Sequence, residues 1–470
     1  MDAEDLAFAG IARQAELIRA GEVSSRELAE LYLERIERLN PDLNVFTEVL
    51  GERALAEADA ADARRGADGG EQPLLGVPVA VKDNVDVEGA VTAYGTRAFG
   101  DRPATADGEI VRRLRDAGAV ILAKTTLSDL AILPFTETQA WGASRNPWDT
   151  DRSVGGSSGG SAGAVAAGLV GAASATDGGG SIRIPAAFCG LVGLKPQRGR
   201  VPMAPHDHWN NLSASGCVTR TVADTALFLD VVTAGGGDPG GPQAPEQPFT
   251  EAARSAPGRL RIAISERPAR AILPPVVSDE VKAGLAETEQ LLRSLGHDVR
   301  RHEPSFGLTG NNFVPRYLGG IREDVDAVPY PERLEPRTRR FGRLGRAYPA
   351  AVVRRATRVA AADAEKINRS WSEFDVLVTP TVGETAIEIG RWQGKGALRT
   401  LLGLSRTYAF TPTWNHTGQP AAAIPAGFTA NGLPRSVTLV GRPCDETTLL
   451  SLAAQIEAER RWFDRRPAVS

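Results

Sequence analysis

Lysine, histidine, cysteine and methionine are all scarce in this sequence. Its 470 residues include six Lys, five His, three Cys and two Met, although Lys and Arg together number 54. The three cysteines are too few and too far apart for a disulfide framework or for the paired spacing of a zinc site. Because so few side chains can change charge near neutral pH, a proton-transfer site has only a small set of candidates.

The charge pattern excludes several classes of partner. A formal net charge of −4 at pH 7 argues against a nucleic-acid-binding surface that covers most of the chain. Residues 1–5 are acidic and lack the basic region and apolar core of a signal peptide. Residues 153–176 carry no charge, but they are mostly Gly, Ala and Ser and are too weakly apolar to span a membrane. We therefore expect a cytoplasmic protein with no nucleic-acid and no membrane partner.

Short apolar runs alternate with helical patterns along the chain. Ser24 and Glu27 have the spacing of a capping box that begins a helix, and Asn40–Pro41 is expected to end it. The other expected helices cover residues 108–117, 221–233, 279–295 and 446–460. The expected strands cover residues 76–81, 119–123, 260–265, 376–378 and 436–440. This alternation predicts an α/β protein whose sheet is mostly parallel, with helices on both faces.

An arginine-rich tract lies in the middle of the chain, where few other patterns are found. Nine arginines lie between Arg333 and Arg358. We favour a solvated helical face for this tract, because runs of like charge usually face water. A docking site for an acidic substrate or partner is the alternative.

The most unusual segment runs from Gly155 to Arg183 and has a glycine-rich turn at each end. The first turn reads GGSSGGS and the second reads DGGGSIR. Glycine is common where a backbone adopts a positive φ or approaches a ligand closely, and its N–H groups are free to bind an anion. A flexible linker is the alternative, but a linker rarely leads directly into an Ala/Gly-rich helix and a strand.

Three chemistries could use such turns. Phosphate binding would require a GxxxxGK[ST] or GxGxxG pattern, and neither occurs within residues 155–183. Residues 155–159 satisfy the GxSxG pattern of a nucleophile elbow, which would need a downstream histidine such as His416. The third chemistry uses a lysine base. Lys82 ends an apolar run, and burial would lower its pKa so that the neutral amine could accept a proton through a relay serine. Spacing does not tell which serine plays which part.

Several motifs together resemble those of the amidase signature family. They comprise GVPVAVKDN at 76–84, the two glycine-rich turns, NPWD at 146–149, CGLVGLKP at 189–196, FDVLVTPT at 374–381, GQPA at 418–421 and GLP at 432–434. They cover most of residues 5–240 and 371–460 and leave the middle of the chain unmatched. The combination is far more specific than GxSxG alone.

The resemblance implies a single α/β/α domain over residues 1–470, with a mixed, mostly parallel central sheet flanked by helices. Its expected parts are an N-terminal helical part, a catalytic core, a variable region that lines the substrate site and a C-terminal part that completes the sheet. They span residues 1–65, 66–240, 243–372 and 373–470.

The resemblance also implies a Ser–cisSer–Lys triad. Lys82 would be the base, Ser157 the relay that follows a cis peptide bond, and Ser181 the nucleophile that carries the acyl group. The expected oxyanion hole consists of the backbone N–H groups of Gly178, Gly179, Gly180 and Ser181. Gly178 stands where the family usually has Thr, Ile or Leu. This chemistry requires no cofactor and no metal.

Other residues are expected around this triad. The expected substrate-binding residues are Ser158, Trp414 and Asn415. The pocket walls are expected from segments 125–145, 200–215, 300–345 and 384–416. Lys124 and Lys195 are expected to be structural, and Arg183 with Asp177 is expected to anchor the nucleophile loop. Residues 206–209, with two His and one Asp, are expected at the pocket rim or in an exposed loop rather than at a metal.

The expected activity is hydrolysis of a small-molecule carboxylic amide to a carboxylate and an amine or ammonia. Linear amides are expected, and cyclic amides are left open. The alternative is the amide-hydrolysing A subunit of a glutamyl-tRNA(Gln) amidotransferase, which would need partner subunits. A catalytically silent binding scaffold is disfavoured because all three triad positions are present. The resemblance leaves the oligomeric state open, with a homodimer as one outcome.

Overall fold

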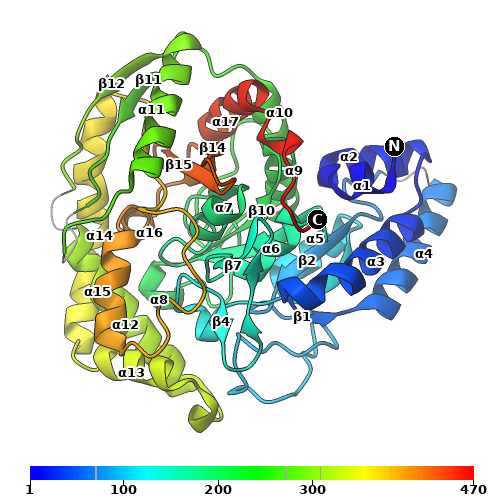
Figure 1. Ribbon diagram of the computed structural model, residues 1–470, viewed down its shortest axis with the longest axis horizontal. Helices are drawn as coiled ribbons and strands as arrows, with labels where there is room; N and C mark the ends of the chain where they lie inside the picture. The colour runs from blue at the N-terminus through cyan, green and yellow to red at the C-terminus, as the bar shows by residue number, and fades with distance from the viewer. Residues whose placement is uncertain (69–70, 270–272, 307–308) are drawn as a thin grey trace.

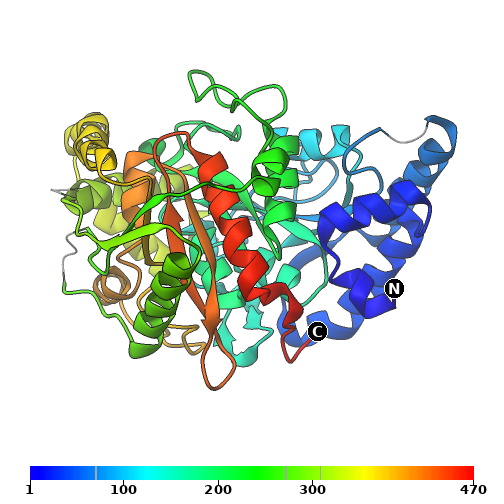
Figure 2. The same cartoon turned by 90° about the horizontal axis from the view of Figure 1, so that it is seen from above.

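A single sheet of 11 strands forms the centre of the protein. The computed structural model describes residues 1–68, 71–269, 273–306 and 309–470. Helices cover both faces of this sheet (Figure 1, Figure 2). Neighbouring strands follow the order β1 (Phe46–Val49), β3 (Val120–Thr125), β2 (Pro78–Lys82), β8 (Ala172–Asp177), β10 (Ala214–Thr219), β9 (Val192–Lys195), β14 (Ala421–Phe428), β15 (Pro434–Val440), β13 (Val376–Pro380), β11 (Arg261–Ile264) and β12 (Asp298–Arg301). All four expected parts of the chain supply strands to this layer.

The sheet is mixed, as the sequence predicts, but it is not mostly parallel. Parallel pairing is confined to β3–β2–β8 toward one end and to β13–β11–β12 at the other. The strands from β8 to β13 pair antiparallel, as does β1 with β3. The expectation of a mostly parallel sheet was therefore wrong. A hydrophobic run locates a strand but does not set its direction, and the short connection from β14 to β15 requires antiparallel pairing.

The capping box and the helix that it begins are confirmed. Ser24 and Glu27 exchange both capping hydrogen bonds at the start of α3 (Ser25–Leu43). The helix does not stop at Asn40–Pro41, as expected, but continues through Pro41 to Leu43. The helix ends at Asn44, which has a left-handed conformation and whose N–H donates a hydrogen bond to the carbonyl of Asn40. An asparagine tolerates that conformation better than most residues, so it is an effective helix end.

The remaining predicted helices are present within a residue or two of their expected bounds. They are α5 (Glu109–Asp116), α9 (Val222–Thr233), α11 (Asp279–Ser294) and α17 (Glu446–Arg460). The helices not predicted individually include α1 (Ala3–Ala7), α2 (Gly10–Ala20), α4 (Gly51–Asp68), α7 (Arg183–Cys189), α8 (His208–Asn211), α10 (Phe249–Arg254), α12 (Thr309–Ala327) and α15 (Ala397–Thr407). In Figure 1, α1–α4 lie at one end of the molecule and α12–α15 at the other.

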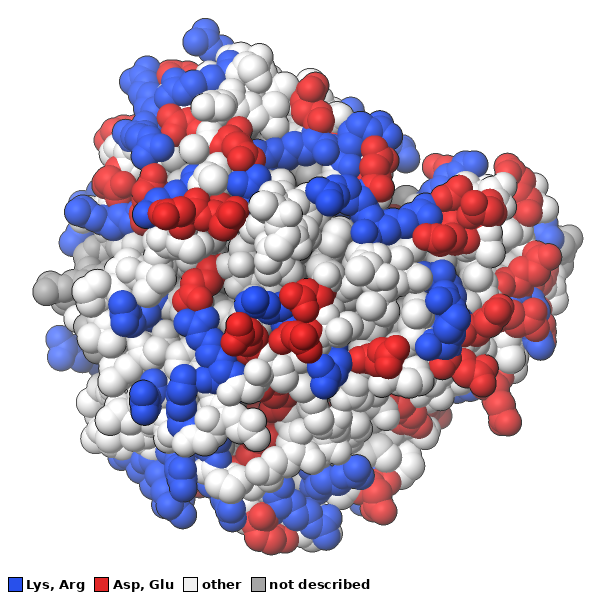
Figure 3. Space-filling model, viewed as in Figure 1, with Lys and Arg blue, Asp and Glu red and all other residues white. Residues whose placement is uncertain are grey.

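The arginine-rich tract forms a solvated helical face, as the favoured interpretation predicts. It lies on α13 (Pro336–Gly345), α14 (Ala350–Asn368) and the residues just before them. Seven of its nine arginines are exposed. Acidic and basic side chains both occur across the face of the molecule shown in Figure 3. None of the helices in the described residues has the length and apolar character needed to cross a membrane.

Two adjacent parallel strands position the site. Every residue of β2 and of β8 is buried, because the sheet is covered on both faces at this point. Lys82 is the last residue of β2, and Asp177 is the last residue of β8. Parallel strands end at the same edge of a sheet, where α/β proteins commonly bind ligands. The lysine and the start of the second glycine-rich turn are therefore neighbours.

Candidate active site

The side chain of Lys82 is completely buried at the end of β2. Its Nζ lies 2.8 Å from Oγ of Ser157 and 2.8 Å from Oγ1 of Thr176. Burial lowers the pKa of Lys82 to about 7, although the negative charge of Asp177 acts in the opposite direction. A large share of the amine is therefore neutral near pH 7, and in that form its nitrogen can accept a proton from a hydroxyl.

Ser157 lies in the first glycine-rich turn, between β7 (Asp149–Ser153) and α6 (Gly159–Ala166). The Gly156–Ser157 peptide bond is cis, as the resemblance implies. The turn packs closely against its neighbours, because a Cβ on Gly156 would lie 2.6 Å from the backbone nitrogen of Phe135. Glycine is therefore required before Ser157, whose buried hydroxyl contacts the lysine.

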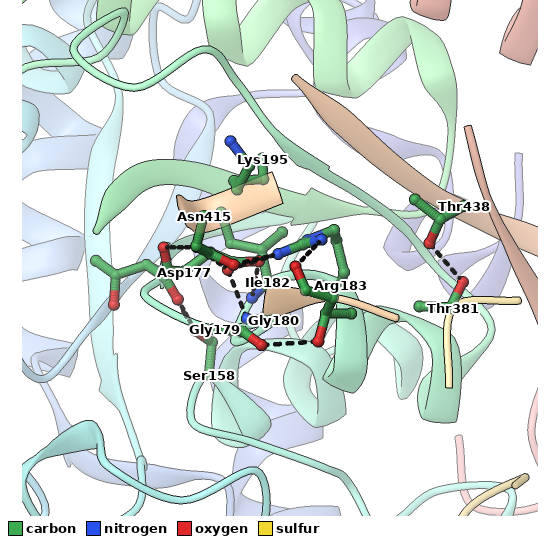
Figure 4. A network of polar contacts seen from close by, with 12 residues as sticks. Ser158, Asp177, Gly179, Gly180, Ile182, Arg183, Lys195, Thr381, Asn415 and Thr438 are labelled. Atoms are coloured by element: carbon green, nitrogen blue, oxygen red, sulfur yellow. Dashed lines mark hydrogen bonds and ion pairs between the residues drawn. The ribbon is translucent and has the colours of Figure 1, made fainter. Parts of the chain in front are cut away.

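Asp177 organises the second glycine-rich turn, residues 178–182, which follows β8 (Figure 4). Its carboxylate accepts hydrogen bonds from the backbone N–H of Gly180 at 2.6 Å and of Ile182 at 3.2 Å. Arg183 donates two hydrogen bonds to the same carboxylate, at 2.9 and 3.0 Å. Burial alone would raise the pKa of Asp177, but the Arg183 guanidinium holds it well below its usual range. The carboxylate therefore stays charged and fixes the turn.

Arg183 and Asn415 connect this turn to α16 (Pro412–Thr417). Arg183 donates to Oδ1 of Asn415 at 2.7 Å and to the backbone carbonyl of Thr411 at 3.0 Å. The Asn415 amide donates to the backbone carbonyl of Asp177 at 2.7 Å and to its carboxylate at 2.8 Å. The prediction that Asp177 and Arg183 anchor this loop is confirmed.

The second turn leaves three backbone N–H groups without a hydrogen-bond partner among the residues that the structure describes. They belong to Gly178, Gly179 and Ser181. The N–H of Gly180 instead donates to Asp177, so the prediction that Gly180 contributes to the oxyanion hole is corrected. Position 180 requires glycine for two reasons. Its φ is +129°, and the Cβ of any other residue would lie 2.4 Å from Oγ1 of Thr411.

A cavity of about 330 Å³ opens beside Gly179 and Ser181. The four expected wall segments supply most of its lining, namely Ala131, Ile132, Leu133, Pro134, Trp209, Gly310, Asn311, Phe313, Val314, Tyr317, Leu401, Leu404, Ser405, Tyr408, Ala409, Pro412 and Thr413. Ile184, Ala269 and Tyr348 complete the lining. These side chains are mostly apolar or aromatic, and none of the described lining residues is charged.

The three residues expected to bind substrate do not line this cavity. Trp414 is 1% exposed and packs edge-on against Phe306, with ring centroids 5.9 Å apart. Asn415 is engaged in the hydrogen bonds that hold the second turn. The Ser158 hydroxyl accepts from the backbone N–H of Thr176 at 3.3 Å and donates to its carbonyl at 3.2 Å. The substrate-binding prediction for Ser158, Trp414 and Asn415 is corrected, because all three are buried and none lines the cavity.

Sequence analysis did not single out Ser174 and Thr176, although both contact the lysine. The Ser174 hydroxyl accepts from the backbone N–H of Lys82 at 2.9 Å, and Oγ1 of Thr176 contacts its Nζ. Asn84 also donates to Oγ1 of Thr176, at 3.2 Å. Ser174 and Thr176 are two positions apart on a strand, so they face the same side. The sequence signal that could have identified them is the pair of polar residues at alternate positions of an otherwise apolar run.

The other two buried lysines have structural partners, as predicted. Nζ of Lys124 lies 2.7 Å from the carboxylate of Asp83 and donates to the backbone carbonyl of Val91 at 2.7 Å. Nζ of Lys195 donates to the backbone carbonyl of Pro196 at 2.8 Å. Burial lowers the pKa of Lys195 well below its usual value. Neither amine has a serine hydroxyl among its described hydrogen-bond partners.

His416, the histidine that the nucleophile-elbow interpretation would use, is not free to act as a base. Both ring nitrogens of His416 are engaged, Nε2 at 2.9 Å from the Asp363 carboxylate and Nδ1 at 2.9 Å from Nη1 of Arg316. Burial, together with the charge of Arg316, lowers the pKa of His416 to about 4. The nucleophile-elbow interpretation is therefore not supported. In the 206–209 segment, as elsewhere in the described ranges, no group of three or more metal-ligating side chains is assembled.

Comparisons with known proteins identify related sequences and a solved structure with the same fold. A model of the Amidase family matches residues 27–450. The chain is 49% identical over 476 residues to "Putative amidase AmiB2" of Mycobacterium tuberculosis, with 100% of both chains covered. It is 34% identical to the 6-aminohexanoate-cyclic-dimer hydrolase of a Pseudomonas species, covering 97% of this chain and 95% of that protein. A solved structure of 6-aminohexanoate cyclic dimer hydrolase with its substrate superposes with a TM-score of 0.89 at 30% identity, covering 99% of this chain and 100% of that one.

Replacement of Asp177 by asparagine tests the role of the buried ion pair. Asp177→Asn keeps the shape of the side chain but leaves Arg183 as an unpaired buried charge. We expect the free energy of unfolding to fall by about 3–5 kcal/mol, measured by urea denaturation. The control is Asp116→Asn, which removes an exposed pair with Arg112 and should change stability by about 1 kcal/mol or less. Equal losses in the two variants would contradict the assignment.

Proposed function

The chain belongs to the amidase family, and we propose that it hydrolyses a neutral carboxylic amide through an acyl-enzyme on Ser181. Lys82 acts as the base, and Ser157 passes protons between Lys82 and Ser181. The observation that carries this proposal is the buried Lys82 amine 2.8 Å from the Ser157 hydroxyl. The turn that holds Ser157 is bonded to Ser181, because the Ser158 N–H donates to the Ser181 carbonyl at 3.3 Å, and Ser181 lines the cavity. Gly179 and Ser181, whose N–H groups have no partner among the described residues, both line this cavity.

The surroundings of Lys82 suit a base rather than a permanent cation. Its side-chain amine contacts two hydroxyls, which can donate as well as accept hydrogen bonds. A neutral amine can donate an N–H to Thr176 and direct its lone pair toward the proton of Ser157. Arginine could not replace it, because a guanidinium does not release its proton in proteins.

Acylation begins when the Ser181 hydroxyl attacks the amide carbon. Its proton passes to Ser157 as the Ser157 proton passes to Lys82, so Lys82 becomes an ammonium. Negative charge develops on the carbonyl oxygen, and backbone N–H groups preorganised around it stabilise that charge. The unpartnered N–H groups of Gly178, Gly179 and Ser181 are the candidates for this role.

Collapse of the tetrahedral intermediate releases the amine. The Lys82 ammonium returns its proton through Ser157 to the departing nitrogen, and the acyl group stays on Ser181 as an ester. Water then attacks this ester, with the neutral Lys82–Ser157 pair again accepting the proton. As the ester bond breaks, the Lys82 ammonium returns this proton through Ser157 to the Ser181 oxygen, which restores the hydroxyl and the neutral amine. The released acid ionises to the carboxylate in solvent.

The cavity favours an uncharged substrate with apolar substituents. Its described lining carries no charged side chain, and burial of an unpaired charge is costly. Free glutamine, the ammonia donor of the amidotransferase alternative, carries two charged groups beside its amide, so that alternative is not favoured. The name of the related cyclic dimer hydrolase supports including cyclic amides among the candidate substrates.

Substitution of the proposed base tests the mechanism. We expect Lys82→Ala to lower kcat on an aryl amide by about 100-fold or more, because general-base assistance is lost. Ser181→Ala is expected to lower it at least as much and to abolish labelling by a fluorophosphonate probe. Lys282→Ala, which removes a half-exposed lysine of α11, is the matched control and should retain activity. Hydrolysis of the aryl amide at the wild-type rate in either site variant would refute the proposal.

The pH dependence provides a second test. Lys82 must be neutral in the free enzyme to accept the proton, so kcat/KM is expected to rise with pH and level off above an apparent pKa of about 7. The measurement is kcat/KM for one neutral amide at pH values on both sides of 7, so that the substrate itself does not titrate. A profile that is flat through this range, or that falls as pH rises, is incompatible with Lys82 as the base.

Substrate charge provides a third test. We expect neutral aryl and alkyl amides to be hydrolysed by the isolated chain without ATP or tRNA. The kcat/KM for glutamine is expected to be at least about 100-fold lower than that for the neutral amides, because the charged groups of glutamine would be buried without partners. The comparison uses equal concentrations of folded enzyme and direct detection of the carboxylate product. A preference for glutamine would favour the amidotransferase alternative.

A further inference from the structure

Trp209 is held at the cavity wall between two glycines. Its side chain lines the cavity, and the residue is only 5% exposed. A Cβ on Gly178 would lie 2.7 Å from Cε3 of the indole, and a Cβ on Gly320 would lie 2.6 Å from Cδ1. Gly178 begins the second glycine-rich turn, whereas Gly320 lies on α12. Two distant parts of the chain therefore leave room for one ring.

The absence of a side chain at Gly178 has no backbone explanation. Gly178 does not have a positive φ, unlike Gly180 in the same turn. Its Cβ would contact the benzene half of the indole and, at 3.2 Å, Oγ of Ser213. The space beside the first residue of the turn is thus occupied by Trp209 instead of by a side chain at position 178.

The backbone at Trp209 is strained, and it is held by the buried Arg316 and the partly buried Arg198. Trp209, Asn210 and Asn211 have φ of 52°, 55° and 63°, a conformation that costs energy for residues other than glycine. Arg316, on α12, donates to the carbonyl of Asn210 at 2.7 and 3.1 Å and to that of Asn211 at 2.6 Å. Arg198 also donates to the carbonyl of Asn211, at 2.6 Å. Such strain persists only where the surroundings enforce it, often at functional sites.

The orientation of the indole is also determined by its neighbours. Its Nε1 donates to the carboxylate of Asp324 at 2.6 Å. Tyr317 packs edge-on against the ring, with centroids 5.3 Å apart and an interplanar angle of 83°. Phe313 stacks on Tyr317 in turn, and both line the cavity. The ring is therefore a rigid part of the wall and not a side chain that swings freely.

We propose that Trp209, in the space that Gly178 and Gly320 leave for it, determines how wide a substrate the cavity accepts beside the turn that carries Ser181. The inference rests on the proposed function, because it concerns the same cavity. The indole excludes branching next to the scissile carbonyl or amine, so narrow, unbranched amides are preferred. Trp209 thus acts as a specificity-determining residue.

Variants of Trp209 test the inference directly. The substrates are acetyl p-nitroanilide, its pivaloyl analogue and an acetamide with a branched alkyl amine. We compare the ratio of kcat/KM for each branched amide to kcat/KM for the unbranched one. Trp209→Ala is expected to raise this ratio by about tenfold or more for at least one branched amide, because the pocket gains space for the extra methyl groups. Trp209→Phe, a milder change that keeps an aromatic ring, should move the same ratio in the same direction. Unchanged ratios for both branched substrates in both variants would overturn the inference.

A reciprocal pair of substitutions tests the steric link. Gly178→Ala places a methyl group against the indole, and we expect kcat/KM for acetyl p-nitroanilide to fall by about tenfold or more, because the turn is displaced. In the Trp209→Ala background the same substitution should cost about twofold or less, since the opposing ring is absent. An equal cost of Gly178→Ala in both backgrounds would contradict the link.

Two further measurements separate the possible failures. Leu401→Ala widens the cavity at another wall position and is not expected to relieve the cost of Gly178→Ala. Circular dichroism and urea denaturation establish that each variant is folded before its rates are compared. If the wild-type chain hydrolyses none of the amides and is not labelled by the fluorophosphonate, the proposed function fails. If it is active but the selectivity of the Trp209 variants is unchanged, only this inference fails.

Discussion

The site depends on the buried ion pair between Asp177 and Arg183. Both side chains are fully excluded from water, so each must satisfy the charge of the other. The carboxylate also accepts hydrogen bonds from two backbone N–H groups of the second turn. The guanidinium also donates to a backbone carbonyl at the start of α16. The turn that carries Ser181 is therefore held between strand β8, which precedes it, and helix α16, which lies far away in the sequence. Gly179 and Ser181, whose N–H groups the pair does not use, line the cavity.

The partners of each buried lysine determine what that lysine can do. Lys124 pairs with the Asp83 carboxylate, although it also contacts the Thr92 hydroxyl, and Lys195 lies against backbone carbonyls. Carboxylates and carbonyls only accept hydrogen bonds. The described side-chain partners of the Lys82 amine are both hydroxyls, which can also give up a proton. All three amines are excluded from water. Burial alone therefore does not identify a base, and the chemistry of the surrounding polar atoms makes the distinction.

Much of this arrangement could be predicted, because local sequence carries the information. The capping box at Ser24, the closing helix α17 and the strand that ends at Lys82 follow from spacing within a few residues. The cis bond before Ser157 followed from the family resemblance. Strand direction did not follow, nor did the use of the Gly180 N–H by Asp177 or the burial of Trp414. Each of these depends on which distant segment lies opposite, and hydrophobic or glycine-rich patterns do not record that.

The sequence by itself determined the residue types that the chemistry needs: a lysine at the end of an apolar strand, serines in two glycine-rich turns, and few histidines to compete with them. Only the tertiary structure decided their environments. Excluding water from Lys82 moves its pKa toward 7, and pairing Asp177 with Arg183 fixes the second turn. Packing Trp209 against Gly178 and Gly320 shapes the cavity beside that turn. These properties arise from contacts between segments far apart in the chain, because desolvation and steric fit exist only once those segments have come together.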